Sequence, residues 1–228
     1  MQTEEKTHSP YDNRIFLADK PLELTSADVV RIFKKEFDIG KIGHSGTLDP
    51  KATGLLVLCS GKLTKKITEF IDYDKSYEGV IRIGATTKSF DTETEEENFA
   101  DVSGIGDEEL ESARKQFIGE IVQMPPMYSA LKHKGKPLYK FARKGREIER
   151  KPRNIHVEEF EITKISDTEV GFRISASKGA YIRCIANDFG AALGVGGYLK
   201  TLRRTRIGKF QIGEFKESVR NIPFIIME

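Results

Sequence analysis

Long apolar runs and cysteines are both scarce in this sequence, and each shortage excludes classes of protein. The two cysteines, Cys59 and Cys184, lie 125 positions apart in no paired motif, so a disulfide scaffold is excluded and reduced thiols in a cytoplasmic protein are expected. No apolar stretch approaches the roughly 18 residues of a membrane span. The polar first residues lack the apolar core of a secretory signal.

The length of 228 residues, set against about 150 residues per domain, predicts one domain. An apolar fraction of 38% and a charged fraction of 32% are typical of a globular chain, and regular apolar runs exclude disorder of the whole. We expect the polar residues 1–13 to form a disordered tail and residues 14–228 to form the single domain. No internal repeat is visible.

A net charge of only +2 conceals separate acidic and basic blocks. Residues 91–111 contain ten acidic residues and no Lys or Arg, whereas residues 132–153 contain ten basic and two acidic residues. Residues 200–209 add five bases and no acid. Blocks of one sign indicate either a solvated surface or a binding face for a polyanion. Because Tyr139 and Phe141 lie within the first basic block, a nucleic acid is one such polyanion.

Hydrophobic periodicity predicts an α+β fold with a mixed sheet, because strands outnumber helices and do not alternate with them strictly. Thr25 and Ser26 stand where the N-cap of the first helix belongs, and Asp107 where that of a later helix belongs. Helices are expected over residues 25–40, 63–71, 107–117, 179–194 and 198–204. Strands are expected over residues 14–19, 55–59, 77–83, 155–165, 170–175 and 208–212.

The densest motif is the segment 43–54, a predicted loop in which three glycines and one proline surround His44 and Asp49. Glycines permit tight turns and a close approach of the backbone to a ligand. The plain alternative is a surface turn, in which Asp-Pro is common. An apolar strand follows at once, however, and functional loops are typically anchored to such core elements.

Other catalytic signatures are missing. Thr47 replaces the last Gly of the Gly-x-Ser-x-Gly elbow of serine hydrolases, and no Gly-x4-Gly-Lys-Ser/Thr loop for nucleotide phosphates occurs. The four histidines have no partner at metal-ligand spacing, so no metal site is expected. Tyr181 and Arg183 stand at a Gly-marked strand-to-helix junction, where they could line a cleft; a surface arginine is the plain alternative.

Taken together, these segments closely resemble the TruB family of tRNA pseudouridine synthases over roughly residues 14–213. The matching motifs occur in order and at matching spacing: Asp19-Lys20-Pro21, Thr25-Ser26, Gly43-His44-Ser45-Gly46-Thr47-Leu48-Asp49-Pro50, Ala52-Thr53-Gly54, Lys75-Ser76-Tyr77, Gln123-Met124-Pro125-Pro126, Tyr128-Ser129-Ala130, Lys178-Gly179-Ala180-Tyr181-Ile182-Arg183 and Leu202-Arg203-Arg204-Thr205 with Gly208. The resemblance implies a single catalytic domain with the pseudouridine synthase fold. In that fold helices flank a mixed, mostly antiparallel central sheet, and the active-site cleft runs across it.

The resemblance implies a catalytic role for three residues. Asp49 is the expected nucleophile, Tyr77 stacks on the target base and takes part in proton transfer, and Arg183 pairs with Asp49. A carboxylate nucleophile can form a covalent intermediate and so divide one difficult step into two. A neighbouring arginine would keep its pKa low. No cofactor and no metal are expected.

Four more residues are expected to contact the substrate nucleotide or to support the loop of Asp49: His44, Tyr181, Leu202 and Lys20. The sequence departs from the family at Glu23, where the first motif often carries Gly, and at residues 91–95, which lack a common Gly. Because the sequence ends at Glu228, we expect a short form without the C-terminal RNA-binding domain of many relatives.

The activity that this resemblance implies is the isomerisation of uridine 55 in the TΨC arm of tRNA, with the base flipped out of its stack. The expected enzyme is a cytoplasmic monomer that binds the TΨC stem-loop and needs neither a protein partner nor a membrane. Two alternatives stay open at this point. One is a subunit of a guide-RNA-dependent pseudouridine synthase, and the other is a non-catalytic RNA-binding or tRNA-folding module.

Overall fold

The computed structural model describes residues 9–227, which form two compact units. Unit 1 contains residues 9–75 and 203–227, and unit 2 contains residues 76–202. Most of the predicted tail over 1–13 lies outside the described residues. Its described end makes hydrogen bonds, from Ser9 Oγ to the Phe37 carbonyl at 2.6 Å and from Ser60 Oγ to the Tyr11 carbonyl at 2.6 Å. The single domain over 14–228 stays a prediction.

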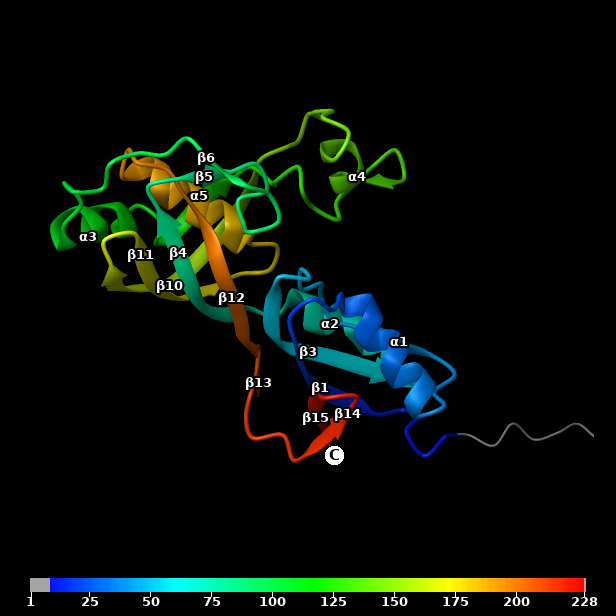
Figure 1. Ribbon diagram of the computed structural model, residues 1–228. Helices are drawn as coiled ribbons and strands as arrows, with labels where there is room; N and C mark the ends of the chain where they lie inside the picture. Colours follow the sequence, from blue (N-terminus) through cyan, green and yellow to red (C-terminus); the bar gives the residue numbers. More distant parts are fainter. Residues whose placement is uncertain (1–8, 228) are drawn as a thin grey trace, which may run out of the picture. The chain divides into compact units, whose positions relative to one another are not determined.

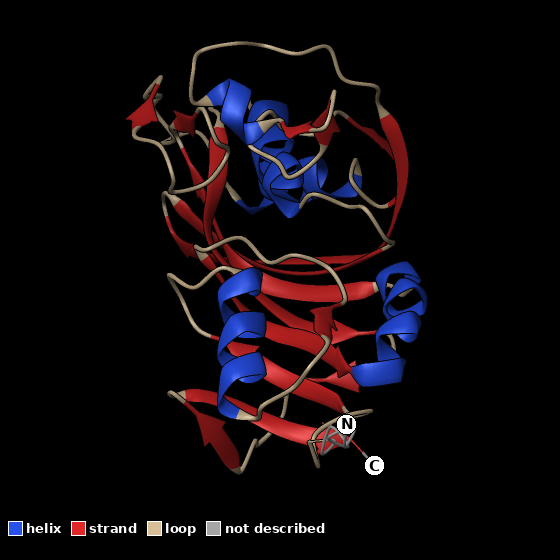
Figure 2. Ribbon diagram, turned by 90° about the vertical axis from the view of Figure 1, so that its right-hand side faces the viewer, coloured by secondary structure: helices blue, strands red, loops and turns tan. Residues whose placement is uncertain are grey.

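Unit 1 is a sheet covered by a helix on each face. Its strands follow the order β14 (Glu217–Val219), β15 (Ile222–Met227), β1 (Ile15–Lys20) and β3 (Ala52–Ser60), and β2 (Ile42–His44) also pairs with β3. Successive side chains of a strand point to opposite faces. Phe16 and Leu58 therefore pack with α1 (Ser26–Glu36), whereas Leu17 and Val57 pack with α2 (Ile67–Asp72). Figure 2 shows helices on both sides of these strands.

The first helix begins where the sequence predicts. Thr25 is the N-cap of α1: the Asp28 amide donates to Thr25 Oγ1 at 3.0 Å, and the Thr25 amide donates to Asp28 Oδ2 at 2.8 Å. This reciprocal arrangement satisfies two amides that the helix itself leaves unpaired. Val29 and Phe33 on its inner face are fully buried, as their spacing predicts.

Unit 2 consists of strands with helices on one face (Figure 1). The order is β12 (Gly197–Ile207), β4 (Lys75–Ile83), β11 (Glu169–Ala176), β10 (Arg153–Ser166) and β7 (Gly119–Gln123). Helices α3 (Asp107–Lys115) and α5 (Ile182–Ala192) pack on these strands through a core that includes Phe160, Ile174 and Phe189. Two short strand pairs precede α4 (Tyr139–Ala142): β5 (Thr86–Thr87) with β6 (Glu96–Glu97), and β8 (Lys132–His133) with β9 (Lys136–Pro137). The second pair and α4 lie in the basic block of residues 132–153, named the basic insertion below.

The helix predicted over residues 198–204 is wrong, because this segment lies in strand β12. Leu, Lys and Arg favour a helix locally, but propensity is a weak signal that tertiary pairing overrides. β12 has hydrogen-bonded neighbours on both sides, and that pairing is invisible to a local pattern.

Smaller differences concern the ends of elements. The predicted loop 43–54 is shorter, since β2 runs to His44 and β3 begins at Ala52. The helix predicted over 63–71 divides into the 3-10 helix η1 (Gly61–Lys66) and α2, Gly106 rather than Asp107 caps α3, and the last predicted strand reduces to β13 (Phe210–Gln211). The periodicity predicts no strand at β7, β14 or β15, which are short or contain proline and gain their stability from neighbouring strands.

The α+β class with a mixed, mostly antiparallel sheet is confirmed. The strand pairs β1–β3, β1–β15, β7–β10 and β10–β11 are all antiparallel, and an isolated bridge between Asp91 and Leu199 is parallel. Within residues 9–227, no helix has the length and apolar character that crossing a membrane would require.

Candidate active site

Asp49 lies in unit 1, in a tight connection between two antiparallel strands. β2 ends at His44 and β3 begins at Ala52, whose amide donates to the Asp49 carbonyl at 3.0 Å. The Ser45 amide donates to the Val57 carbonyl at 2.9 Å, so the loop is pinned to the core strand β3 at its start. Asp49 is half-buried.

The two neighbours of Asp49 are both anchored, one to the first residue of α1 and the other to the segment before that helix. Ser26 Oγ accepts a hydrogen bond from the Leu48 amide at 2.8 Å and donates to the Leu48 carbonyl at 3.2 Å. The Glu23 amide donates to the Pro50 carbonyl at 2.9 Å. The backbone on either side of Asp49 is therefore held, which limits the positions that its carboxylate can take.

Glu23 departs from the family's usual glycine, and the structure shows how the turn forms without it. Its φ of 67° lies in the left-handed region that favours glycine. The Glu23 carboxylate accepts a hydrogen bond from Lys51 Nζ at 2.8 Å. Because both side chains are largely exposed, this ion pair adds little stability.

Lys20 is a buried cation beside this loop. Its side chain is fully buried, and Nζ donates to the carbonyls of Pro21 at 2.8 Å and Leu24 at 2.7 Å. Burial lowers the pKa of Lys20 to about 8, while the negative charge of Asp49 acts to raise it. The predicted role of Lys20 in supporting the loop thus has a physical basis, because its ammonium group binds the backbone of residues 21–24 and interacts electrostatically with Asp49.

His44 stands at the start of the same loop, where its surroundings disfavour the charged form of the imidazole. Burial lowers its pKa, the backbone of Gly46 acts in the opposite direction, and the charge of Arg204 lowers it further. Its Nδ1 atom is buried and has no hydrogen-bond partner within residues 9–227. A buried polar atom without a partner is costly and needs an explanation, such as a ligand that completes it.

Arg183 lies in unit 2, in the first turn of α5, and is almost completely buried. Its guanidinium donates to the carbonyls of Ser89 at 3.2 Å and Tyr128 at 2.8 Å, and it forms an ion pair with Asp91 at 3.2 Å. A cation at the start of a helix opposes the helix dipole. A buried carboxylate such as Asp91 offsets that cost.

Sequence reasoning missed Asp91. It is the first of ten acidic residues in the block 91–111 and the one acidic residue of that block that is buried. Charge pattern alone does not separate it from its solvated neighbours. The signal that could have found it is Arg183, because an arginine buried with the apolar residues of α5 requires an acidic partner.

The other predicted residues of unit 2 are Tyr77 and Leu202, which pack in its apolar core, and Tyr181, which is half-buried. Tyr77 on β4 is 7% exposed and packs in the same apolar cluster as Leu202 on β12. Tyr181 is the N-cap of α5, and the Gln123 side chain binds its backbone twice, at 2.8 Å and 3.0 Å. The guanidinium of Arg153 lies over the Tyr181 ring at 5.4 Å.

The structure thus gathers the predicted residues into two groups. Unit 1 brings together Lys20, His44 and Asp49, and unit 2 holds the rest: Tyr77, Tyr181, Arg183 and Leu202. The pairing of Asp49 with Arg183 joins one group to the other, and it stays a prediction.

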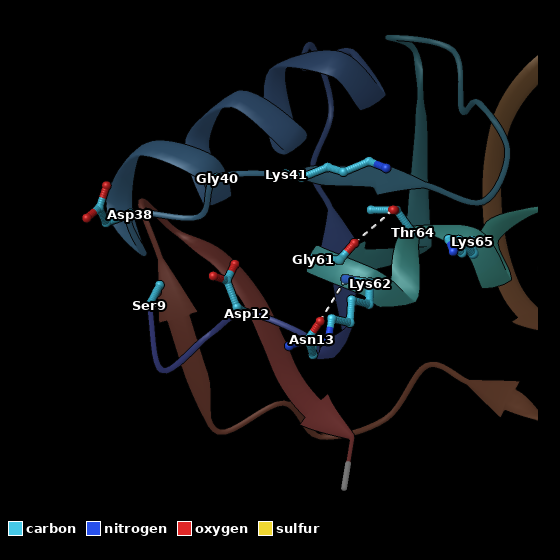
Figure 3. Close-up of a pocket in the computed structure, with 10 residues that line it drawn as sticks. All are labelled: Ser9, Asp12, Asn13, Asp38, Gly40, Lys41, Gly61, Lys62, Thr64 and Lys65. Carbon is cyan, nitrogen blue, oxygen red and sulfur yellow. Dashed lines mark hydrogen bonds between the residues drawn. The ribbon is translucent and has the colours of Figure 1, made fainter. Parts of the chain in front are cut away.

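A cavity of about 700 Å³ opens elsewhere in unit 1, and no predicted site residue lines it (Figure 3). Its wall includes Lys41, Lys62 and Lys65, and Asn13 Oδ1 accepts a hydrogen bond from the Lys62 amide at 2.7 Å. Across the described part of the chain, no three His, Cys, Asp or Glu side chains are grouped to hold a metal ion.

Comparison with known proteins places the chain in a family. Residues 34–182 match the family profile described as TruB family pseudouridylate synthase (N terminal domain). The tRNA pseudouridine synthase B of Chlorobium chlorochromatii (strain CaD3) is 51% identical over 209 residues, which cover 90% of this chain and 82% of that protein. The protein of the same name from Flavobacterium johnsoniae is 45% identical over 211 residues, covering 88% of this chain and 91% of that protein.

Solved structures support the same assignment. A chain of a Cbf5-Nop10-Gar1 complex is 28% identical with a TM-score of 0.71, over 94% of this chain and 57% of that chain. A chain of an H/ACA RNP bound to a substrate RNA containing 2'-deoxyuridine is 25% identical with a TM-score of 0.67, over 94% and 56%. This chain spans a little over half the length of these solved chains, and the likeness confirms the pseudouridine synthase fold. The sequence, the fold and the similarity to its relatives agree that the chain belongs to the TruB family of pseudouridylate synthases.

Proposed function

We propose that this protein isomerises uridine 55 in the TΨC arm of tRNA to pseudouridine, with Asp49 as the nucleophile. The observation that carries the proposal is the loop of Asp49. The residue before Asp49 is hydrogen-bonded to Ser26, the first residue of α1, and the residue after it is hydrogen-bonded to Glu23. Its relatives that are about half identical are named tRNA pseudouridine synthase B. A carboxylate held in place in a glycine-rich loop suits covalent catalysis.

The reaction needs only groups that the chain and the substrate supply. The bond from C1′ of the ribose to N1 of uracil breaks, a bond from C1′ to C5 forms, and the proton on C5 leaves while N1 gains one. There is no net oxidation or reduction. Asp49 supplies the electron pair that divides this exchange into two steps, and Tyr77 stacks on the flipped base and takes part in the proton transfer.

Arg183 pairs with Asp49 in this proposal and keeps the carboxylate ionised. His44, Tyr181 and Leu202 contact the flipped nucleotide or fill the space that it leaves. Unstacking a base costs about a few kcal/mol, part of which stacking on an aromatic side chain returns. The unpartnered Nδ1 of His44 supports its role, since a nucleotide would offer that atom a hydrogen bond.

The basic insertion supplies the proposed contact with the phosphates of the TΨC stem-loop. Lys134, Lys136 and Arg143 are all exposed, and Arg143 also forms an ion pair with Glu93 at 2.7 Å. Phosphate contacts position a nucleic acid without reading its sequence. We further propose that the protein acts in the cytoplasm as a monomer, with no cofactor and no protein partner.

A guide-RNA-dependent subunit is the second candidate, because the solved chains that resemble this one come from assemblies with other proteins. The higher identity to the relatives named tRNA pseudouridine synthase B favours the first candidate. A non-catalytic RNA-binding module would explain the basic insertion, but it gives no reason to anchor both neighbours of Asp49.

The test is a single-turnover assay on an unmodified tRNA transcript that carries tritium at uracil C5, with no added RNA or protein. We expect the wild type to release tritium from position 55 alone, and a transcript with cytidine there to release none. Asp49→Asn should lose on the order of a thousandfold in rate, equivalent to about 4 kcal/mol, while its tRNA affinity changes by a few fold.

The matched control is Asp38→Asn, an exposed aspartate of unit 1 with a φ of 47°, which asparagine tolerates well. It should keep the wild-type rate. Activity of Asp49→Asn within tenfold of the wild type would refute the nucleophile assignment. Turnover that appears only with a guide RNA and partner proteins would favour the second candidate, and tRNA binding without turnover would favour the module.

A further inference from the structure

Arg204 on β12 is a buried arginine to which the family resemblance assigns no role. It is the largest of the fully buried side chains in the described part of the chain, with 2% of its surface exposed. Its Nε donates to the Leu55 carbonyl at 2.8 Å, and its Nη2 donates to the Gly46 carbonyl at 3.3 Å. Gly46 lies in the loop of residues 45–51, here named the nucleophile loop, and Leu55 lies in β3, which follows that loop. One planar guanidinium therefore joins the loop to the strand after it, on either side of Asp49.

The backbone of β12 also packs directly against the start of β3. A Cβ atom added to Gly54 would lie 2.3 Å from the Arg204 carbonyl oxygen and 2.7 Å from its amide nitrogen, so no side chain fits there. Gly54 also has a φ of 104°, which only glycine adopts readily. The guanidinium is therefore carried by a strand that is itself in close contact with the strand after the loop.

The charges of Arg204 and Asp49 both act on Lys20. The charge of Arg204 lowers the pKa of both His44 and Lys20, whereas the charge of Asp49 raises the pKa of Lys20. Arg204 and Asp49 thus influence one ammonium group in opposite directions. A fixed cation in this region also favours the ionised form of a nearby carboxylate.

We propose that Arg204 is a positioning residue for Asp49, holding the nucleophile loop closed by bridging the Gly46 and Leu55 carbonyls. This inference rests on the proposed function, in which Asp49 is the nucleophile. Lysine cannot replace Arg204, because its ammonium is a point charge, whereas the guanidinium is a rigid fork that reaches two acceptors. Displacing a reacting group by about 1 Å costs roughly a hundredfold in rate.

The experiment compares Arg204→Lys with Gly46→Ala, and each variant is assayed for single-turnover pseudouridine formation at saturating enzyme and for tRNA affinity. Gly46→Ala keeps Arg204 but strains the backbone of its acceptor, because Gly46 has a φ of 104°. The strain comes from the backbone and not from a clash, since the added Cβ would meet no atom closer than 3.9 Å. We expect Arg204→Lys to lose roughly a hundredfold in rate with tRNA affinity within a few fold of the wild type. Gly46→Ala should lose about tenfold or more, and the double variant less than the product of the two losses.

The control for general loss of stability is Arg114→Lys in unit 2. Arg114 also donates to a backbone carbonyl, that of Phe160 at 2.6 Å, and its side chain is 18% exposed. Arg114→Lys should lower the melting temperature and leave the saturated rate unchanged. A fall in rate for Arg204→Lys alone therefore reports on the loop rather than on stability.

Two outcomes overturn the inference. The first is a saturated rate of Arg204→Lys within threefold of the wild type. The second is a wild-type rate for Gly46→Ala, and this outcome decides the question if Arg204→Lys does not fold. Asp49→Asn is measured alongside, because an active Asp49→Asn would refute the proposed function itself. An inactive Asp49→Asn together with fully active Arg204→Lys and Gly46→Ala would refute only the role of Arg204.

Discussion

The substitution Asp91→Asn tests the buried ion pair that holds Arg183. The pair is separated by 3.2 Å, and its side chains are 5% and 8% exposed. Removing one charge from a buried pair costs about 3–5 kcal/mol, because the remaining charge is left without compensation. Arg183 keeps its hydrogen bonds to the carbonyls of Ser89 and Tyr128, so we expect a loss near the lower end, about 3 kcal/mol.

A loss of this size lowers the melting temperature by roughly 6–12 °C for a protein of this length. Urea unfolding of Asp91→Asn, Arg183→Gln and the double variant then gives the coupling free energy, which we expect to reach about 2 kcal/mol. The matched control is Glu97→Gln, which breaks the exposed pair with Lys88 at 3.8 Å and should cost at most about 1 kcal/mol.

The same substitution should slow catalysis. If Arg183 pairs with Asp49 as proposed, an arginine released from Asp91 no longer holds the nucleophile at one position, and the saturated rate should fall by roughly tenfold to a hundredfold. tRNA affinity should change by less than the rate does. A coupling free energy below about 0.5 kcal/mol, or a wild-type rate in a folded Asp91→Asn, would refute the reasoning.

Three further predictions concern other parts of the chain. In the first, Lys134, Lys136 and Arg143 of the basic insertion are all replaced by Gln. The slope of log affinity against log salt should become less steep by about two units rather than three, because Arg143 is already paired with Glu93. An unchanged slope would mean that the insertion is only a solvated surface. Glu23→Gly should change the free energy of unfolding by less than about 1 kcal/mol, because relief of the left-handed φ offsets loss of an exposed ion pair; a loss above about 2 kcal/mol in urea unfolding would contradict this. Burial lowers the pKa of Lys20 to about 8 from 10.5, so between these values the unfolded chain binds more protons and the free energy of unfolding rises with pH. Between pH 7 and pH 9.5 the free energy of unfolding of the wild type should therefore rise relative to that of Lys20→Met. A difference between the two proteins that stays constant over this range would show that the pKa of Lys20 is not lowered.

Local sequence determined the parts of the site that local contacts build. Thr25 and Asp28 lie three residues apart, so the cap of α1 is contained in the sequence around it. The glycines and Pro50 of residues 43–54 predict a tight loop around Asp49 for the same reason, because turn geometry depends on neighbouring residues. The buried strand after the loop follows from an unbroken apolar run, of which Leu55, Leu56, Val57 and Leu58 are fully buried.

Tertiary structure decided which charged residues are buried and what they bind. Nothing near Arg204 in the sequence distinguishes it from Arg203, yet Arg203 pairs with Asp19 at 2.7 Å with 35% of its side chain exposed, whereas Arg204 is buried against two carbonyls. Likewise one carboxylate of the acidic block, Asp91, is buried, since Arg183 meets it across a long stretch of sequence. Burying a charge is favourable only where partners from distant segments satisfy it, and which segments meet is settled by strand pairing and packing rather than by local pattern.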